Sequence, residues 1–340
     1  MDLKTLTEIN APSGHEQAIR RFLLDELKKL GFAPVLDRMG NVVVVKEGTG
    51  DAPRKRVMVS AHMDEVGLIV TSATEDGYLR IAAAGGIDPR VLVSKRVTVG
   101  EDKLPGVIGA VPIHLQSAAE RKHVLSMDEL LVDIGAKNKD EAECKAPMGT
   151  YISFDTPYVE YGDGFACGKA FDDRVGCLSL LRLLQEELPV DLVACFVSEE
   201  EVGCRGAKGA AFQQEPDIGI VLEGTTCNDL GDVPETAHVC EAGQGVAVSF
   251  MDGASIANRA LFRKALDVAK QENIPHQVKH SVSGGNDGGA IQRAREGVPV
   301  VVLSVPCRYI HSPSSVVKLS DVESQFALVK ALVKALVKAL

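Results

Sequence analysis

Apolar strand-like segments that alternate with helical segments constrain the fold of this chain more than any other feature. The strand-like segments are apolar at successive positions, which is typical of strands covered on both faces, and they lie at 42–45, 57–61, 192–197, 218–222 and 300–305. Helical periodicity is found between them, at 174–188, 259–271 and 286–295. This alternation predicts an α/β fold, a three-layer sandwich with a mainly parallel central sheet.

The stretch from residue 67 to residue 165 has a different pattern. Short strand-like pieces alternate there with Gly, Pro and Asp turns, and the clearest pieces lie at 68–71, 78–82, 96–99 and 107–111. We therefore predict a small all-β, barrel-like domain at 67–165. It would be inserted into a discontinuous main domain made of residues 1–66 and 166–340.

Both ends of the chain carry helix signals. Near the N-terminus, Ser13 and Glu16 have the spacing of a capping box, apolar residues follow at helical intervals, and Gly31 is placed to end the helix. The segment 327–340 repeats Ala-Leu-Val-Lys and predicts another helix. We interpret this repeat as a helical extension or an appended tail in preference to an assembly element.

Composition and charge argue against several classes of protein. The net charge of −10 leaves no excess of Lys and Arg for phosphates, so no nucleic-acid partner is expected. The eight cysteines are scattered, without a C-x-x-C pair, which favours reduced thiols and a cytoplasmic protein. The chain start lacks the pattern of a secretory signal, and no apolar run approaches the length of a membrane span, so no membrane partner is expected.

Acidic and histidine side chains lie at or just after the ends of the predicted strands. These residues are His62, Glu200, Glu201, Glu223 and His311. Because active sites collect at the carboxyl ends of strands in parallel sheets, we expect these side chains to converge. Core packing alone would not place acids and histidines at strand ends repeatedly.

The residue types predict a pair of divalent metal ions. His and carboxylate side chains are the ligands that such a pair needs, and a further acid pair, Asp172–Asp173, opens a predicted helix. In Glu200–Glu201, one carboxylate can bind a metal while its neighbour transfers a proton. In His62-x-Asp64, the acid is placed to orient the imidazole. Each motif alone could have a purely structural role, such as helix-dipole stabilisation for Asp172–Asp173, but together they indicate a two-metal hydrolase.

With these motifs assembled, the chain resembles the tetrahedral (TET) aminopeptidases of metallopeptidase family forty-two over nearly its whole length. The resemblance is carried by Ala11-Pro-Ser-Gly14, Ala61-His-Met-Asp-Glu-Val-Gly67, Gly168-Lys-Ala-Phe-Asp-Asp-Arg174, Glu200-Glu-Val-Gly203, Arg205-Gly-Ala207, Gly284-Gly-Asn-Asp287 and Arg308-Tyr-Ile-His-Ser312. It implies an enzyme that removes N-terminal residues from oligopeptides with a water activated between two metals.

The resemblance also implies residue roles. Glu200 resembles the general base, and Asp64 resembles the acid that orients a histidine ligand. One residue of slippage would make Asp173 the bridging ligand in place of its neighbour. The implied metal ligands are His62 and Glu223 for one ion, Glu201 and His311 for the other, and Asp172 as the bridge.

Two positions depart from the family pattern. Glu223 stands where Asp is frequent, and its additional methylene can change metal spacing or preference. Asn286 stands where Thr is commoner before Asp287. Zinc and cobalt both suit His and carboxylate ligands, so either is expected as the cofactor.

The resemblance implies peptide substrates and a hollow dodecamer built from dimers, with the β insertion supplying dimer contacts. A related two-metal amidase, deacylase or carboxypeptidase is the alternative activity. A non-catalytic shell or binding protein is a remote alternative, because the base and all five ligand positions are intact. A polysaccharide hydrolase is disfavoured, since it would pair two carboxylates without histidine ligands.

Overall fold

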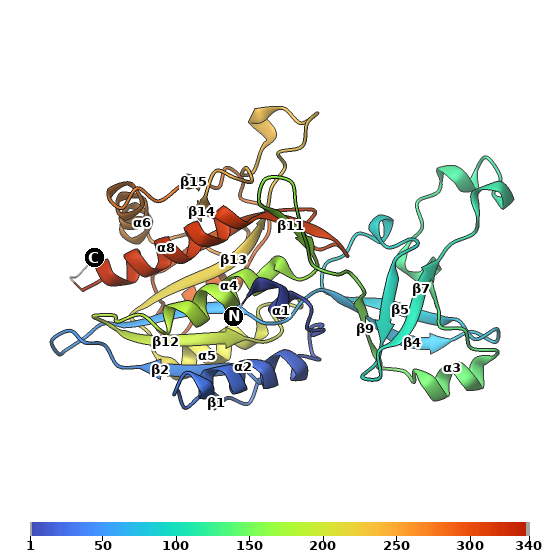
Figure 1. Cartoon of the computed structure of the whole chain (residues 1–340), viewed down its shortest axis with the longest axis horizontal. Coiled ribbons are helices and arrows are strands. Elements are labelled where there is room, and N and C mark those ends of the chain that lie inside the picture. The colour runs from blue at the N-terminus through green and yellow to red at the C-terminus, as the bar shows by residue number, and fades with distance from the viewer. Residues whose placement is uncertain (1, 338–340) are drawn as a thin grey trace.

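The computed structural model describes residues 2–337, which form two bodies lying side by side (Figure 1). The larger body is an 11-stranded sheet covered by helices, and the smaller is a closed six-stranded barrel. The predicted α/β class with an inserted all-β barrel is therefore confirmed. Among the described residues, no helix combines the length and the apolar character needed to cross a membrane.

Four parallel strands form the centre of the large sheet. In spatial order they are β12 (Asp191–Val197), β3 (Arg56–His62), β13 (Ile218–Thr226) and β16 (Val300–Arg308). Their side chains are almost all buried, because helices cover both faces of the sheet. Val197 pairs with His62, and Glu223 pairs with Ser304, so the carboxyl ends of these strands lie along one edge.

Antiparallel strands extend this centre on both sides. Beside β12 lie β2 (Val42–Lys46) and β1 (Val35–Leu36). Beyond β16 lie β17 (Ser315–Lys318), β11 (Phe165–Gly168) and β10 (Val159–Tyr161), while β14 (Val246–Ser249) also pairs with β16 and carries β15 (His276–Val278). The sheet is thus parallel in its centre and mainly antiparallel at its flanks, where β14 and β15 form a parallel pair.

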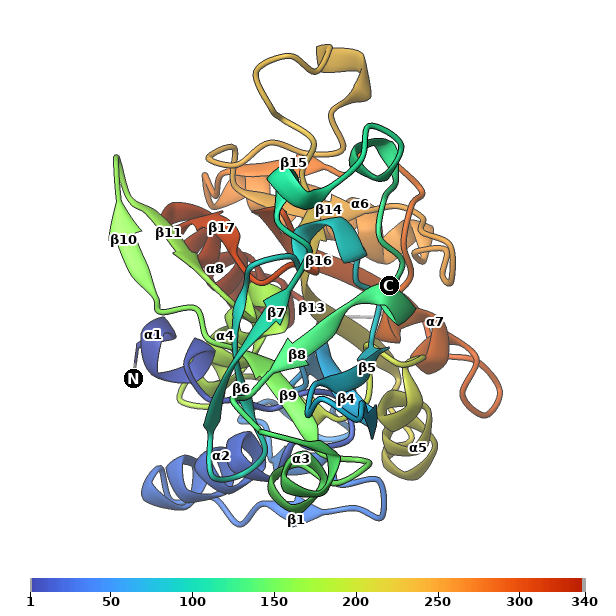
Figure 2. The same ribbon diagram turned by 90° about the vertical axis from the view of Figure 1, so that its right-hand side faces the viewer.

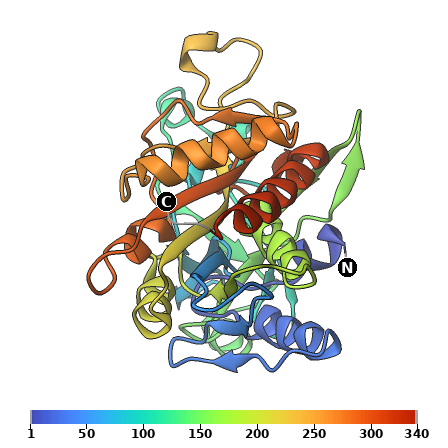
Figure 3. The same ribbon diagram turned by 90° about the vertical axis from the view of Figure 1, so that its left-hand side faces the viewer.

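Helices cover the two faces of the sheet unequally, as Figure 3 shows. One face carries α2 (Gln17–Lys29), α4 (Phe171–Leu183), α6 (Arg259–Gln271) and α8 (Leu319–Ala335), with the short α1 (Leu3–Thr7) beside α4. The other face carries α5 (Arg205–Gln214) and α7 (Asp287–Gln292), the latter shorter than predicted.

The predicted C-terminal helix is present as α8, and its repeat contributes to the core. Leu328, Val329, Leu332 and Val333 are fully buried against the sheet. The helix is therefore part of the packed body through Ala335, and the last three residues of the repeat lie outside the described residues.

The smaller body is a closed barrel of six strands, which faces the viewer in Figure 2. Its strands are β4 (Gly67–Ala73), β5 (Leu79–Ala84), β6 (Arg96–Val99), β7 (Leu104–Gly109), β8 (Leu131–Asp133) and β9 (Tyr151–Phe154), joined in the order β4-β5-β8-β7-β6-β9. Leu68, Leu79, Ile108, Val132 and Ile152 fill its interior. α3 (Lys139–Lys145) packs outside it. Single 3-10 turns lie at Pro89–Val91, Ile113–Leu115, Glu120–Lys122, Met127–Glu129 and Glu235–Ala237.

The capping box predicted for the first long helix is wrong. Helix α2 ends at Lys29, and Gly31 follows its C-cap with a φ of +86°, which suits glycine. The Ser13 hydroxyl, however, donates to Asp64 Oδ2 at 2.6 Å, and Glu16 Oε1 accepts from the Gly14 amide at 2.6 Å. Because the Ser13 hydroxyl is bonded to a buried carboxylate distant in the sequence, the start of α2 has no side-chain cap.

Candidate active site

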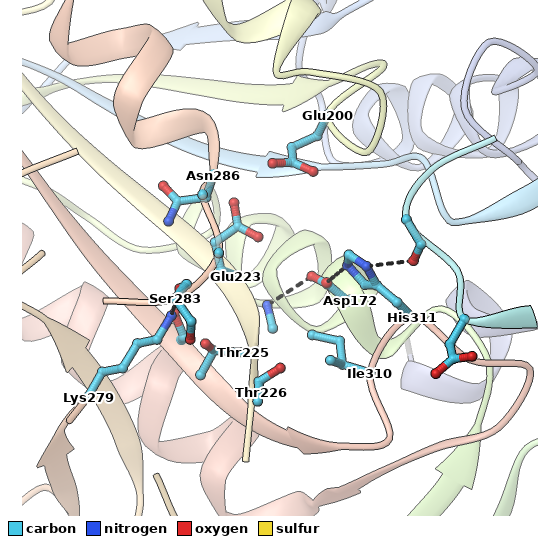
Figure 4. A pocket seen from close by; sticks show the side chains of 16 residues that line it. Asp172, Glu200, Glu223, Thr225, Thr226, Lys279, Ser283, Asn286, Ile310 and His311 are labelled. Atoms are coloured by element: carbon cyan, nitrogen blue, oxygen red, sulfur yellow. Dashed lines mark hydrogen bonds and ion pairs between the residues drawn. The ribbon is translucent and has the colours of Figure 1, made fainter. Parts of the chain in front are cut away.

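The predicted site residues converge at the carboxyl edge of the central sheet, next to a cavity of about 440 Å³ (Figure 4). Those that line the cavity itself are Asp172, Glu200, Glu223 and His311. His62 is the last residue of β3, and Glu223 lies within β13. Glu200 and Glu201 follow β12, and His311 follows β16. The structure brings together all five residues predicted as metal ligands, together with Glu200 and Asp64.

Asp172 lies between the two histidines. Its Oδ1 atom is 3.3 Å from His62 Nε2, and its Oδ2 atom is 3.4 Å from His311 Nε2. Each histidine also has a second carboxylate beside it: Glu223 Oε2 lies 3.6 Å from His62 Nε2, and Glu201 Oε2 lies 3.3 Å from His311 Nε2. The result is two adjacent sets of donors that share one carboxylate.

Asp173, the residue after Asp172, is directed into the protein. Asp173 Oδ2 accepts from the His62 amide at 3.2 Å, and Oδ1 accepts from the Gly176 amide at 3.0 Å. The carboxylate rests so closely on Gly176 that a Cβ atom there would lie 2.4 Å from Asp173 Oδ2. Asp173 also lies near enough to His62 and Glu223 to form a donor group with them, but its oxygens are already engaged by backbone amides. Asp172 is therefore the better bridging candidate.

The backbone after β12 explains how two consecutive acids reach one cavity. Glu199 has a φ of +54°, in the left-handed region, and this breaks the alternation of an extended strand. Its own carboxylate turns away and pairs with Arg205 at 3.2 Å. Glu200 and Glu201 are then both directed toward the histidines.

Asp64 connects the acid pair to His62. Its carboxylate accepts from the amides of Glu200 at 3.0 Å and Glu201 at 3.2 Å, as well as from Ser13. His62 Nδ1 lies 3.1 Å from the backbone oxygen of Asp64 and 3.5 Å from its Oδ1 atom. The orienting contact to the imidazole thus comes first from the carbonyl of Asp64, while its carboxylate holds the Glu200–Glu201 backbone.

A buried ionic cluster supports the loop that carries Asp64. Lys169 Nζ contacts both oxygens of Glu65 at 2.8 Å, and each side chain is only 3% exposed. The fully buried Arg174 donates to the carbonyl oxygens of Met63 and Ile9 at 3.0 and 3.1 Å. Lys169, just before α4, and Arg174, in its first turn, therefore fix the chain on both sides of Asp64.

The cluster has the electrostatics of a cation site. Burial alone would lower the pKa of His311, but its hydrogen bond with Asp172 and the charge of Glu201 raise that pKa to about 9. Burial raises the pKa of Glu201 to about 8. Burial alone would raise the pKa of Asp172, but its hydrogen bonds with His311 and His62 lower it. Without a metal ion, protons on the imidazoles thus compensate the negative charges of the carboxylates. A bound cation would take over this compensation.

The donors present fit divalent cations. Glu223 Oε1 is buried without a hydrogen-bond partner, which calls for an additional positive ligand at that position. Within residues 2–337, no Lys or Arg lies within 4.0 Å of the carboxylates of Asp172, Glu200, Glu201 or Glu223. Imidazole nitrogens and carboxylate oxygens are suitable ligands for first-row divalent metals.

Glu200 is free to move a proton. Its Oε2 atom is 4.0 Å from His62 Nε2, and Oε1 accepts from the Cys204 thiol at 3.3 Å. Burial raises its pKa. Asp287 lies close to Glu200 and Cys204 and is fully buried. Neither of its carboxylate oxygens has a hydrogen-bond partner within residues 2–337. A buried carboxylate with a raised pKa can accept and release a proton near neutral pH.

Several residues around the site carry no role that sequence reasoning could predict. Ser13, Glu65 and Lys169 lie in the family motifs, but their contacts join segments distant in the chain. Lys279, which lines the cavity, lies outside every motif and has no sequence signal. Gly86, from the inserted barrel segment, places its carbonyl oxygen 3.0 Å from His311 Nδ1.

Comparison with known proteins identifies the family. The sequence profile of the M42 glutamyl aminopeptidases matches residues 40–328. The glutamyl aminopeptidase of Lactococcus lactis subsp. cremoris is 34% identical over 331 residues, covering 94% of this chain and 91% of that protein. The lysyl aminopeptidase of Pyrococcus furiosus is 33% identical over 340 residues, covering 97% of this chain and 95% of that protein.

A solved structure agrees with these relatives. The TET1 peptidase of Pyrococcus horikoshii, which can assemble into a tetrahedron or a large octahedral shell, matches with a TM-score of 0.86 at 33% identity. The match covers 97% of this chain and 98% of that structure. Since both the family profile and full-length relatives match, this chain belongs to the M42 glutamyl aminopeptidase family and is an aminopeptidase.

Proposed function

We propose that this aminopeptidase removes N-terminal residues from oligopeptides with two divalent ions, zinc or cobalt, bound at the His62–His311 cluster. The observation that carries the proposal is the position of Asp172, whose two oxygens face two different histidines. His62 and Glu223 would hold one ion, Glu201 and His311 the other, and Asp172 both. Such a pair supplies a lowered pKa for water and polarises the scissile carbonyl.

Glu200 is the proposed general base. Its carboxylate borders the cavity and lies opposite His62, within reach of a water held by the cluster. It would accept a proton from that water and transfer it to the leaving amine, which needs a base whose pKa lies near the working pH. The raised pKa of Glu200 in its buried position suits this role.

Asp64 is the proposed positioning residue. Through one carboxylate it holds the amides of both Glu200 and Glu201, and through its carbonyl it orients His62. The proposed base and the two proposed ligands therefore share one buried anchor. Its displacement would alter metal binding and proton transfer together.

The test is hydrolysis of aminoacyl p-nitroanilides and their N-acetylated counterparts by metal-stripped protein, with zinc, cobalt or manganese added back. Metal-dependent cleavage of the free-amine substrates alone is expected. Cleavage restricted to the blocked substrates would favour a two-metal deacylase, and the absence of any metal-restored cleavage would point to a non-catalytic shell.

The assembly we propose is a dodecamer built from dimers, with residues 67–165 forming the dimerisation domain. The barrel segment exposes apolar side chains in one loop: Val111, Ile113, Leu115 and Val124 are between 59% and 73% exposed. Neighbouring apolar residues of this size are unusual on a solvated surface and favour a protein contact. The shells formed by the Pyrococcus horikoshii relative support the same assembly.

A cytoplasmic location completes the proposal. All eight cysteines lie within the described residues as free thiols, and five of them are buried. Reduced thiols agree with a reducing compartment. Expression of a tagged chain followed by cell fractionation would test this location directly.

A further inference from the structure

Lys279 has an unusual position for a lysine. It follows β15, is only 6% exposed, and lines the same cavity as the proposed metal ligands. Lysines are seldom buried to this extent unless they are paired with an acid. Within residues 2–337, no carboxylate lies within 4.0 Å of the Lys279 ammonium group. This group donates a hydrogen bond to the backbone oxygen of Ser283 at 3.1 Å.

The ammonium group therefore has donors to spare. It carries three N–H bonds, and the backbone oxygen of Ser283 occupies one of them. Thr225 and Thr226 line the same cavity, and Figure 4 shows the Lys279 side chain directed toward Ser283 and the cavity. An ammonium group that shares a cavity with two hydroxyl-bearing residues is a suitable recognition set for a carboxylate.

The rest of the cavity has the opposite charge. Asp172, Glu200 and Glu223 lie on its metal-binding side, and Asp88 at its edge is paired with Arg90. These carboxylates would repel an acidic side chain everywhere except beside Lys279. Figure 4 shows Lys279 and His311 on opposite sides of the cavity, so the positive group of Lys279 lies away from the His311 side.

We propose that Lys279, with Thr225 and Thr226, forms a subsite for the side-chain carboxylate of an acidic N-terminal residue. This inference rests on the proposed function, because only an aminopeptidase places the N-terminal side chain beside the metals. Family membership does not decide the preference, since relatives of similar identity are a lysyl and a glutamyl aminopeptidase.

The first test compares two substrates of the same shape on the wild-type enzyme. Glutamyl p-nitroanilide carries the charge, and glutaminyl p-nitroanilide is its neutral counterpart. We expect kcat/KM to be roughly 10- to 100-fold higher for the glutamyl substrate, the range of a charge-assisted hydrogen bond in an enclosed site. Equal values, or a preference for glutaminyl or lysyl substrates, would overturn the subsite. This comparison needs no variant.

The second test changes the protein. Lys279→Gln should bring the glutamyl-to-glutaminyl ratio close to one, and Lys279→Glu should shift the preference toward lysyl p-nitroanilide. The exposed Lys208, which lies on α5 away from the cavity lining, provides the matched control Lys208→Gln, which should keep the wild-type ratio. An unchanged ratio in both Lys279 variants would refute the assignment.

Two further outcomes distinguish a side-chain subsite from a different role for Lys279. The Lys279→Gln variant is also tested on the dipeptide glutaminyl-alanine and on the same dipeptide with an amidated C-terminus. If it loses cleavage of the free-acid dipeptide but not of the amide, Lys279 binds the chain-terminal carboxylate, against the proposal. Failure of the metal-loaded wild type to cleave any free-amine substrate would refute the proposed function itself. Cleavage of neutral substrates without preference for glutamyl would refute the subsite alone.

Discussion

Asp172 and Asp173 are adjacent acids at the start of one helix, yet they have different surroundings. The motifs assign the bridging role to Asp172, with Asp173 as the alternative if the register slips by one residue. The contacts that favour Asp172 depend on non-helical backbone angles at both residues, which turn Asp173 onto the His62 and Gly176 amides. Such angles are set by tertiary contacts and leave no periodic pattern in the sequence.

At the same scale, Glu200→Gln is expected to separate catalysis from metal binding. The amide cannot accept a proton, so kcat should fall roughly 10²- to 10⁴-fold, while metal content stays at the wild-type level. Metal analysis by mass spectrometry and turnover of a p-nitroanilide would be measured on the same sample. His311→Ala is the contrasting variant and should lose part of its metal. Full turnover in Glu200→Gln would show that another residue is the base.

Metal binding should release protons. His311, with a pKa raised to about 9, and Glu201, with a pKa raised to about 8, are both mainly protonated at pH 7 without metal. A cation must displace these protons, so affinity should decrease as pH falls from 8 to 6 and at least one proton should appear in solution. Calorimetry in two buffers of different ionisation enthalpy would count the protons. A pH-independent affinity would contradict the expectation.

At the scale of elements, the central strands were predictable because their apolar sequences require burial on both faces. The antiparallel flanks and the missing helix cap were not. The direction of a flanking strand depends on how it is connected to the rest of the chain. The helix cap is missing because the Ser13 hydroxyl donates to Asp64, which is 51 positions away. Local signals compete with partners that only the folded chain brings close.

The Lys169–Glu65 pair is expected to stabilise the junction of α4 with the loop after β3. Replacing Lys169 by Met would leave the buried Glu65 carboxylate with only the Ala11 amide and the more distant Arg174, 4.0 Å away, to compensate it. The expected cost in unfolding free energy is about 3 kcal/mol, the lower end of the range for a broken buried ion pair. Urea denaturation followed by circular dichroism would measure it. Lys29→Met, which breaks the exposed pair with Glu26, should leave the unfolding free energy nearly unchanged, because solvent screens this pair. Equal effects of both variants would show that burial is not decisive.

At the scale of the whole molecule, the exposed loop of the barrel makes assembly testable. The double variant Ile113→Lys and Leu115→Lys places two charges in the proposed contact and should reduce the assembly to smaller species by sedimentation velocity. Val35, 63% exposed on β1 of the main body, gives the control Val35→Lys, which should sediment as the wild type. Persistence of the large species in the double variant would place the contact elsewhere.

The carbonyl of Gly86 has a consequence for how this architecture can change. It belongs to the inserted segment, yet it contacts His311, which the chain reaches 225 residues later. The chain leaves the main body just after Asp64 and returns to it through β10 and β11, and β11 leads directly to Asp172. Both connections of the barrel therefore lead to residues of the proposed catalytic centre. Exchange of the barrel for that of a homologue would therefore be a change to the active site as well, and chimeras should be screened for chemistry before assembly is considered.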